Sequence, residues 1–410
     1  MEHDGKRTMR PLPETNVVPK RRRLENEKMS TLMSLSEYFP PESFPLYKFP
    51  SPIAEYSVTK ERNVVPGRAE AKYFYGKILE KDAAFHFDLN KGFEIFESKD
   101  DLLQDERLDI LSKWLISRAA PNVGLSEVCF HADFVCYRGL LTRIASTPYD
   151  VMEDWIVGAV RIGSTIFLCE FRTEEKKLRQ EMLDRRDKLM CYWGFKFEQY
   201  VTTDSPLVRR KKAFFFFWKE KQLSWSLYLT TPVTDQVVSN MKEFDVVMRT
   251  TLGNKGGGIR LLFSAETDCL DSEGHYLELK TQAYGMVSNF WKLKAMKWWI
   301  QSFLAGVQQI VVGIRDNKGV VRSVKRVKVA ELCRRAVDWT PSRTFNFLLD
   351  VLTLIKSRMY EVHSLSYMLF EYNHANGKIT FRHVPTEGDE FAQYRFLSDD
   401  FLKHFGAGAE

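Results

Sequence analysis

The sequence predicts an α/β protein with mixed, largely antiparallel twisted sheets and flanking helices. Three observations support this. Strand-like and helix-like hydrophobic patterns alternate along the chain. The composition, 44% hydrophobic and 28% charged, is typical of a soluble globular protein. No apolar run approaches the roughly eighteen residues of a membrane span, so no membrane partner is expected.

Residues 1–38 are predicted to be a disordered tail because they are polar, contain several prolines and lack hydrophobic periodicity. Within the tail, Lys20-Arg21-Arg22-Arg23 is a basic cluster that a nuclear import receptor can read, although such clusters also arise by chance. The tail therefore favours a nuclear location for the protein, and a cytoplasmic location stays open as an alternative. Residues 39–410 contain neither a long linker nor an internal repeat, so a single domain is expected there.

Residues 40–100 are rich in proline and aromatic side chains and are expected to lie extended over the core. Helical spacing predicts helices over residues 102–118, 174–200 and 290–304. Strands are predicted over residues 164–171, 213–218, 244–249, 259–269, 276–281, 309–314 and 320–324. The last two strands flank Asp316-Asn317-Lys318-Gly319, a sequence typical of a hairpin turn.

Charge and cysteine content restrict the class of function. Residues 292–335 contain eleven Lys or Arg against two acids, which suits a polyanionic partner but also a solvated lysine face. The six cysteines are scattered, with no CxxC pair and no grouping with histidine. This pattern argues against a zinc site and a disulfide framework, and for a reducing compartment.

The sharpest local signal is Glu266-Thr-Asp268 followed by Glu278-Leu-Lys280. In a strand, residues i and i+2 face the same way, so each pair shares a face. A hairpin that pairs Asp268 with Glu278, and Glu266 with Lys280, leaves residues 271–275 as the connection. Three carboxylates and one ammonium group then cluster.

Clustered carboxylates repel one another unless protons or cations intervene, and hard oxygen ligands suit Mg²⁺ or Mn²⁺. A lysine beside them can contact an attacked phosphate, which is the arrangement of metal-assisted phosphoryl hydrolysis. ExD followed by ExK resembles the PD-(D/E)xK nuclease core. The alternative is an exposed hairpin with mixed charge. Glu243-Phe-Asp245 has the same ExD spacing without a following ExK, and is expected to be surface or loop.

Several other residues are open to two interpretations. Glu198 lies four residues after Gly194 among aromatic residues, and is either a metal ligand or a paired core carboxylate. Lys294, Lys297 and Gln301 share a helical face. On the same helix, Trp298 and Trp299 are expected to be core residues rather than platforms for base stacking. Arg138 can bind a phosphate group of a ligand or form an ion pair within the protein.

Taken together, these residues resemble the DXO decapping exoribonuclease family. The resemblance extends from about Phe44 to past Val312. Departures fall in the tail, at residues 254–258 and after about residue 330. Five motifs appear in the family's order: Tyr137-Arg138-Gly139, Trp193-Gly194-Phe195-Lys196-Phe197-Glu198, Glu266-Thr267-Asp268, Glu278-Leu279-Lys280, and Lys297-Trp298-Trp299-Ile300-Gln301-Ser302-Phe303-Leu304.

The resemblance implies roles residue by residue. Glu198, Glu266, Asp268, Glu278 and the Leu279 carbonyl match the metal ligands, with two Mg²⁺ or Mn²⁺ ions per site. Lys280 and Gln301 match groups beside the scissile phosphate, and Glu266 also contacts substrate. The remaining substrate-contacting positions are Arg62, Glu106, Tyr137, Arg138 and Gly139. Asp245 falls where the family has a substrate-lining residue of another type.

The resemblance also implies an activity: a metal-dependent hydrolase that removes incomplete or non-standard 5′ caps from RNA, including NAD caps, and releases 5′ pyrophosphate, with 5′-to-3′ exonucleolysis in some members. It implies association with a nuclear 5′-to-3′ exoribonuclease. Two alternatives stay open. One is a catalytically silent RNA-binding scaffold or exoribonuclease cofactor, and the other is a DNA nuclease with the same metal core.

Overall fold

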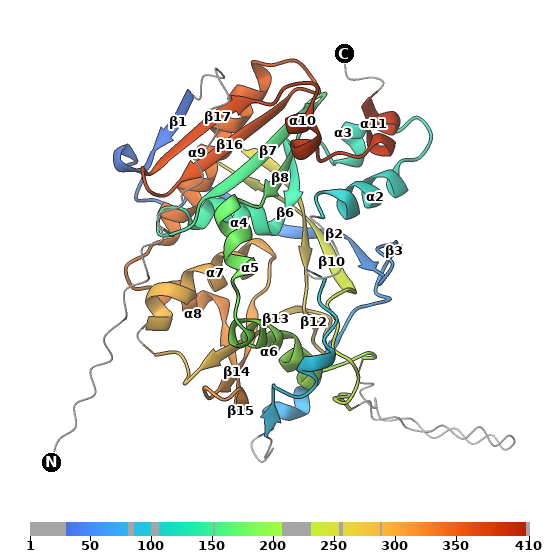
Figure 1. Cartoon of the computed structure of the whole chain (residues 1–410), viewed down its shortest axis with the longest axis vertical. Coiled ribbons are helices and arrows are strands. Elements are labelled where there is room, and N and C mark those ends of the chain that lie inside the picture. The colour runs from blue at the N-terminus through green and yellow to red at the C-terminus, as the bar shows by residue number, and fades with distance from the viewer. Residues whose placement is uncertain are drawn as a thin grey trace, which may run out of the picture.

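The computed structural model describes residues 30–80, 86–99, 106–150, 152–206, 231–253, 257–287 and 289–406. Its strands form two sheets, with ten strands in one and seven in the other. In Figure 1 the ten-stranded sheet fills the upper part of the molecule and β12–β15 lie below it with α6. The predicted fold class is confirmed: sheets dominated by antiparallel pairs, with helices against them.

In the ten-stranded sheet only β6 runs parallel to its neighbours, β8 and β11; the other pairs are antiparallel. In spatial order its strands are β1 (Ser30–Ser34), β17 (Lys378–His383), β16 (Tyr367–Asn373), β7 (Trp155–Ile162), β8 (Thr165–Phe171), β6 (Phe134–Tyr137), β11 (Ile259–Glu266), β10 (Glu243–Leu252), β2 (Tyr47–Val58) and β3 (Val64–Pro66).

The seven-stranded sheet pairs β13 in parallel with β14 and antiparallel with β12. In spatial order its strands are β5 (Phe87–Asp88), β15 (Val320–Lys328), β14 (Gln309–Arg315), β13 (Tyr276–Ala283), β12 (Cys269–Leu270), β4 (Tyr73–Phe74) and β9 (Thr202–Thr203). The predicted hairpin around Asp316–Gly319 is confirmed as β14–β15.

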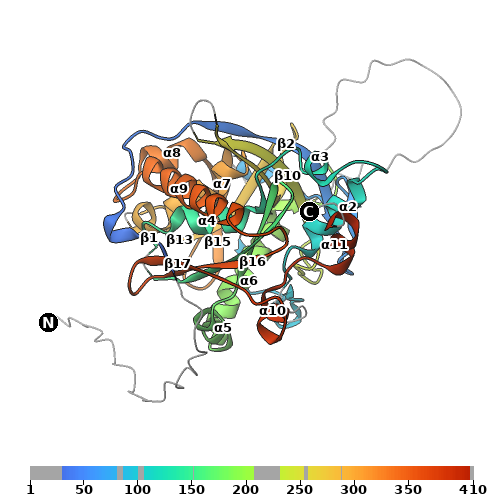
Figure 2. The ribbon, with the colours of Figure 1, turned by 90° about the horizontal axis from the view of Figure 1, so that it is seen from above.

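Helices lie around the two sheets. In Figure 2, α9, α4, α7 and α8 lie together on one side, whereas α5 lies apart from them. The helices are α2 (Asp109–Arg118), α3 (Leu125–Val128), α4 (Arg138–Ser146), α5 (Glu174–Glu181), α6 (Arg185–Val201), α7 (Ala295–Leu304), α8 (Val329–Arg334), α9 (Pro341–Tyr360), α10 (Asp389–Tyr394) and α11 (Asp399–Phe405). Short 3-10 turns cover Leu35–Glu37, Gly76–Leu79 and Phe93–Ile95, and a π-helical turn, Phe290–Lys294, leads into α7.

The packing of α6 on the seven-stranded sheet depends on a glycine. A side chain at Gly313 of β14 would meet the Phe197 ring of α6 at 2.5 Å. Glycine therefore lets the helix lie close to the sheet, which fixes the position of Glu198, the next residue after Phe197. Asp184 caps the start of the helix, where its side chain accepts a hydrogen bond from the Asp187 amide at 2.8 Å.

Most predicted elements are present, with five differences. The helix predicted over residues 174–200 is broken after Glu181 into α5 and α6. The strand predicted over residues 259–269 is broken at Thr267 into β11 and β12. The predicted disorder is wrong for residues 30–37, because β1 pairs with β17 and a 3-10 turn follows it. Residues 47–58, expected to lie over the core, form β2 within the ten-stranded sheet. The helix predicted from residue 102 begins at Asp109, and residues 101–105 and 213–218 lie outside the described residues.

Candidate active site

The chain passes from one sheet to the other between Glu266 and Cys269. Glu266 ends β11 of the ten-stranded sheet, where it lies opposite Asp245 of β10. Three residues later, Cys269 begins β12 of the seven-stranded sheet, opposite Leu277. This register places Asp268 opposite Glu278, as predicted. The predicted pairing of Glu266 with Lys280 is wrong, because the two residues belong to different sheets.

Glu278 is held by two cations. Its carboxylate lies 2.5 Å from the Lys280 ammonium and 3.4 Å from the Arg138 guanidinium, at the first turn of α4. Burial raises the pKa of Glu278, but Lys280 and Arg138 outweigh burial and lower it. Glu278 is therefore a carboxylate at neutral pH, and Arg138 forms the ion pair that was one of its two predicted roles.

Asp268 and Glu198 face the same group of charges. Asp268 accepts a hydrogen bond from the Leu279 amide at 2.6 Å, yet burial and the charge of Glu278 raise its pKa to about 7. The pKa of Glu198 is raised by burial and by Asp268 and Glu266. Carboxylates from α6, β11, β13 and the crossing between the sheets therefore share one electrostatic environment. Among the described residues, only Glu278 of these acids forms direct ion pairs.

The chemistry of these donors fits a hard divalent cation. Carboxylate oxygens, together with the Leu279 carbonyl between Glu278 and Lys280, are the ligands that Mg²⁺ and Mn²⁺ accept. In the described part of the chain, only Asp154, Glu175 and His374 bring three ligand atoms within 4.8 Å of one another, and these residues were not predicted. Among the described residues, no three of the four predicted acids bring ligand atoms that close together.

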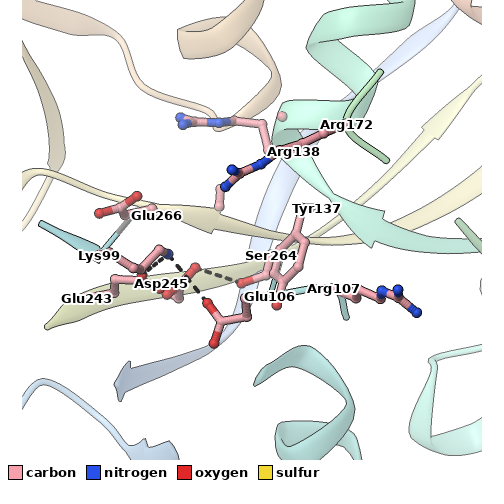
Figure 3. A pocket seen from close by; sticks show the side chains of 12 residues that line it. Lys99, Glu106, Arg107, Tyr137, Arg138, Arg172, Glu243, Asp245, Ser264 and Glu266 are labelled. Carbon is pink, nitrogen blue, oxygen red and sulfur yellow. Dashed lines mark hydrogen bonds and ion pairs between the residues drawn. The ribbon is translucent and has the colours of Figure 1, made fainter. Parts of the chain in front are cut away.

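A first cavity, which we call the arginine cavity, opens beside Glu266 (Figure 3). Arg138 and Arg172 lie on one side of it, and Glu266, Glu243 and Asp245 lie opposite. It is lined by Lys99, Glu106, Arg107, Tyr137, Arg138, Gly139, Arg172, Glu243, Asp245, Ser264, Ala265 and Glu266. The predicted substrate residues Glu106, Tyr137, Arg138, Gly139 and Glu266 are thus brought together.

Ion pairs fix two acids in the wall of the arginine cavity, Glu106 and Glu243. Arg62 binds Glu106 and lies 3.2 Å from Glu243. Lys99 binds Glu243 and lies 3.4 Å from Glu106. Arg62 is itself buried, so in this structure it acts by fixing these two acids.

The expectation that Glu243 and Asp245 are surface or loop residues is wrong. Both lie on β10, and Asp245 is 4% exposed. One Asp245 oxygen accepts a hydrogen bond from Ser264 at 3.0 Å, and the other has no hydrogen-bond partner among the described residues. The sequence did carry a signal for them, since their ExD spacing equals that of Glu266 and Asp268.

A second cavity, the lysine cavity, lies on the Glu198 side. It is lined by Met190, Cys191, Gly194, Phe195, Glu198, Leu279, Lys280, Thr281, Lys294, Lys297 and Trp298. A Cβ at Gly194 would meet no atom within 4 Å among the described residues, so no described segment approaches this glycine closely. Trp299 is buried as predicted, whereas Trp298 is half-buried and lines the cavity. Gln301, on the same helix, lines neither cavity.

The sequence model of the RAI1 like PD-(D/E)XK nuclease family matches residues 48–402. The chain is 34% identical to the decapping nuclease dom-3 of Caenorhabditis elegans, covering 86% of this chain and 84% of that protein. It is 30% identical to the human decapping and exoribonuclease protein, covering 87% of each chain.

The chain belongs to this family. The Candida albicans Rai1 structure, solved with pU5 and Mn²⁺, superposes with a TM-score of 0.70 at 19% identity over 92% of this chain and 98% of that one. The Schizosaccharomyces pombe Rai1 structure, solved with 3′-FADP, gives 0.64 at 24% identity over 87% and 100%. These structures share the fold of this RAI1 like nuclease. None of the helices in the described ranges is long and apolar enough to span a membrane.

Proposed function

We propose that this chain is a metal-dependent hydrolase of RNA 5′ ends. Its substrates are incomplete or non-standard caps, including NAD caps, and 5′ triphosphates, and it continues with 5′-to-3′ exonucleolysis. One observation carries the proposal: Glu278 binds both Lys280 and Arg138, and each of these cations lines a cavity that contains further basic side chains. Asp268 raises the pKa of Glu198, so these two acids lie in the same electrostatic environment. The names of the relatives, and the pU5 and Mn²⁺ in Candida albicans Rai1, support it.

In this proposal two divalent cations, Mg²⁺ or Mn²⁺, are held by the Leu279 carbonyl and by four acids, Glu198, Glu266, Asp268 and Glu278. When bound, the cations neutralise charge on the phosphate and supply hydroxide near neutral pH. The reaction adds water oxygen to phosphorus and breaks the bond to the leaving oxygen, which takes up a proton. A titration of catalytic rate with each metal, together with equilibrium dialysis of Mn²⁺, tests which cation is used and how many bind.

The chain's own residues orient the phosphate. Lys280 is 23% exposed at the edge of the lysine cavity, where its ammonium can contact a phosphate oxygen while Glu278 holds it in place. Arg138 lines the arginine cavity and holds the other Glu278 oxygen. The Lys280 ammonium and the Arg138 guanidinium therefore flank Glu278, one on the side of each cavity. Gln301 and Gly139 are proposed to contact the substrate backbone.

The direct test offers matched oligonucleotides with capped, NAD-capped, triphosphate and monophosphate 5′ ends, and a DNA duplex, each with Mn²⁺. We expect release of the 5′ group from RNA and none from the duplex. Cleavage of the duplex at a similar rate would instead support a DNA nuclease. Binding without any hydrolysis, under Mg²⁺ or Mn²⁺, would support the scaffold alternative.

We also propose that the chain acts in the nucleus, that residues 39–410 work as one catalytic domain, and that it associates with a nuclear 5′-to-3′ exoribonuclease. The basic cluster Lys20–Arg23 supports the first of these. Replacing all four residues with alanine in a fluorescent fusion should move the protein towards the cytoplasm. Unchanged nuclear fluorescence would remove the cluster from the proposal, and co-purification with the exoribonuclease tests the association.

A further inference from the structure

Glu198 borders two cavities. It lines the lysine cavity, and it also lines a third cavity together with Gln199, Gln236 and Val237. In the described part of the chain, its carboxylate forms neither an ion pair nor a side-chain hydrogen bond. The direction of this side chain therefore depends on the walls around it and on the charges that it faces.

The neighbouring charges act against a Glu198 carboxylate that faces the candidate metal site. Burial raises the pKa of Glu198, and the charges of Asp268 and Glu266 raise it further. Before a cation binds, these two acids repel the carboxylate, and the third cavity offers space into which it can turn. A rigid wall in that cavity opposes the turn and keeps the carboxylate ready for the cation.

The wall of the third cavity is fastened to α6 by side-chain hydrogen bonds. The Lys196 ammonium donates to the Thr234 carbonyl at 2.8 Å and to the Gln199 side-chain oxygen at 2.7 Å. The Gln199 amide group donates in turn to the Gln236 carbonyl at 3.0 Å. We call these contacts the Lys196 clamp, and they hold the wall on the helical turn that carries Glu198.

Lys196 is an unusual residue for such a contact. It is 2% exposed, its ammonium lies 5.3 Å from the centre of the Tyr200 ring, and it forms no ion pair with a described carboxylate. Burying an unpaired cation is costly, whereas a charged donor makes a stronger hydrogen bond to a carbonyl than a neutral donor does. The stronger bond makes the wall more rigid.

The clamped segment is also held by a second part of the chain. The Val238 carbonyl accepts a hydrogen bond from the Glu97 amide at 3.1 Å, and the Asn240 amide donates to the Glu97 carbonyl at 3.3 Å. A few residues later the chain enters β10, which carries Glu243 and Asp245 of the arginine cavity. The clamp therefore ties α6 to a segment that is itself fixed, so the wall does not simply move with the helix.

We infer that Lys196 is a positioning residue: by clamping residues 234–236 onto α6, it keeps Glu198 facing the candidate metal site and so increases the affinity for the cation. The inference rests on the proposed function, since it assumes that Glu198 is a metal ligand. Groups that orient a metal ligand without touching the metal typically change its affinity by about ten- to 100-fold. Charge alone predicts the opposite sign, because removing a cation near the acids would strengthen Mn²⁺ binding. The sign of the change therefore separates positioning from charge.

The test measures binding of Mn²⁺ alone to the full chain by equilibrium dialysis, without RNA. Lys196→Met, which removes both hydrogen bonds of the ammonium, is compared with Lys188→Met, at an exposed lysine on the same helix. Gln199→Ala keeps the bond from Lys196 to the Thr234 carbonyl and serves as a milder variant. Melting in EDTA checks that each variant folds, and amide hydrogen exchange of the metal-free protein reports on the opening of residues 234–240.

We expect Lys196→Met to weaken Mn²⁺ binding about tenfold and to speed hydrogen exchange at residues 234–240. Gln199→Ala should weaken binding less, and Lys188→Met should match the wild type. At saturating Mn²⁺ the kcat of Lys196→Met should return close to the wild-type value, because the cation then holds Glu198 in place. A residue that only stabilises the fold would lower the melting temperature without changing the Mn²⁺ affinity of the folded protein.

Unchanged or tighter Mn²⁺ binding by folded Lys196→Met would overturn the positioning role. If Lys196→Met does not fold, Gln199→Ala decides, and wild-type affinity in that variant would overturn the role as well. Both results leave the proposed function intact when the wild type still binds Mn²⁺ and hydrolyses RNA 5′ ends. A wild type that binds no Mn²⁺ would contradict the proposed metal centre instead.

Discussion

The Lys280 ammonium lies 2.5 Å from a Glu278 carboxylate oxygen, and both side chains leave the same face of β13. Glu278 is buried, whereas Lys280 keeps part of its side chain open to the lysine cavity. Burial lowers the pKa of Lys280, but Glu278 and Asp268 outweigh burial and raise it. The lysine is therefore a cation at neutral pH and is positioned beside the proposed metal centre.

Replacing Lys280 with methionine should lower kcat about 100-fold and change KM little. Methionine keeps the apolar length of the side chain and removes the charge that contacts the phosphate as negative charge develops. Arg138 still neutralises Glu278, so the variant should fold. Single-turnover hydrolysis of a triphosphate RNA measures the effect, with Lys378→Met as the control. A Lys280→Met enzyme with wild-type kcat would remove Lys280 from the chemistry.

Replacing Glu266 and Asp268 together with alanine should abolish metal-dependent release of the 5′ group, by about 1,000-fold or more, because several kcal/mol of transition-state stabilisation depend on bound cations. The circular dichroism spectrum should be unchanged. Glu273→Ala, at the exposed tip of the β12–β13 connection, is a matched control that removes a nearby acid without touching the cluster. Full activity in the double variant would contradict the metal assignment.

The register of Asp268 and Glu278 could be predicted because strand alternation and a short connection determine it locally. The separation of Glu266 from Lys280 could not. It depends on the chain leaving one sheet after Glu266, where the Thr267 amide donates to the Phe244 carbonyl. That contact is with a residue more than twenty positions earlier in the sequence, and no local pattern reports it.

The position of Asp245 was missed for a similar reason. The local pattern of Glu243 and Asp245 matches an exposed strand end as well as a buried one. Their burial follows from β2, which pairs with β10 on the side away from β11. The prolines in that segment had suggested an extended covering rather than a strand. Lys99 and Arg62, which form ion pairs with Glu243, also come from distant segments, so no local pattern predicted these ion pairs.

Mn²⁺ should raise the melting temperature of the wild-type protein by a few degrees relative to the same protein in EDTA. A cation that binds only the folded chain at about 100 times its dissociation constant adds about 2.7 kcal/mol to the free energy of unfolding. It also relieves repulsion among Glu198, Asp268 and Glu266. The alanine double variant should show no such increase. Equal increases in both proteins, at matched ionic strength, would place the stabilising cation elsewhere.

Asp133 provides a test of stability that is independent of the active site. Its carboxylate is 5% exposed, accepts hydrogen bonds from the Arg260 amide at 2.7 Å and its guanidinium at 3.0 Å, and binds Lys356 of α9 at 2.8 Å. Burial raises its pKa, but these partners outweigh burial and lower it to about 2. The ionised carboxylate therefore links α9 to β11 of the ten-stranded sheet.

Asp133→Asn should lower the free energy of unfolding by about 2 kcal/mol at pH 7. Because the folded pKa lies below the unfolded one, this contribution is complete above about pH 4 and disappears as the pH falls through 2. Urea unfolding at pH 7, 4 and 3 should therefore show the two proteins converging at low pH. Asp399→Asn, an exposed partner of Arg395, should leave stability nearly unchanged. A difference between Asp133→Asn and wild type that stays constant from pH 7 to pH 3 would show that lost packing, rather than the charge of Asp133, explains the loss.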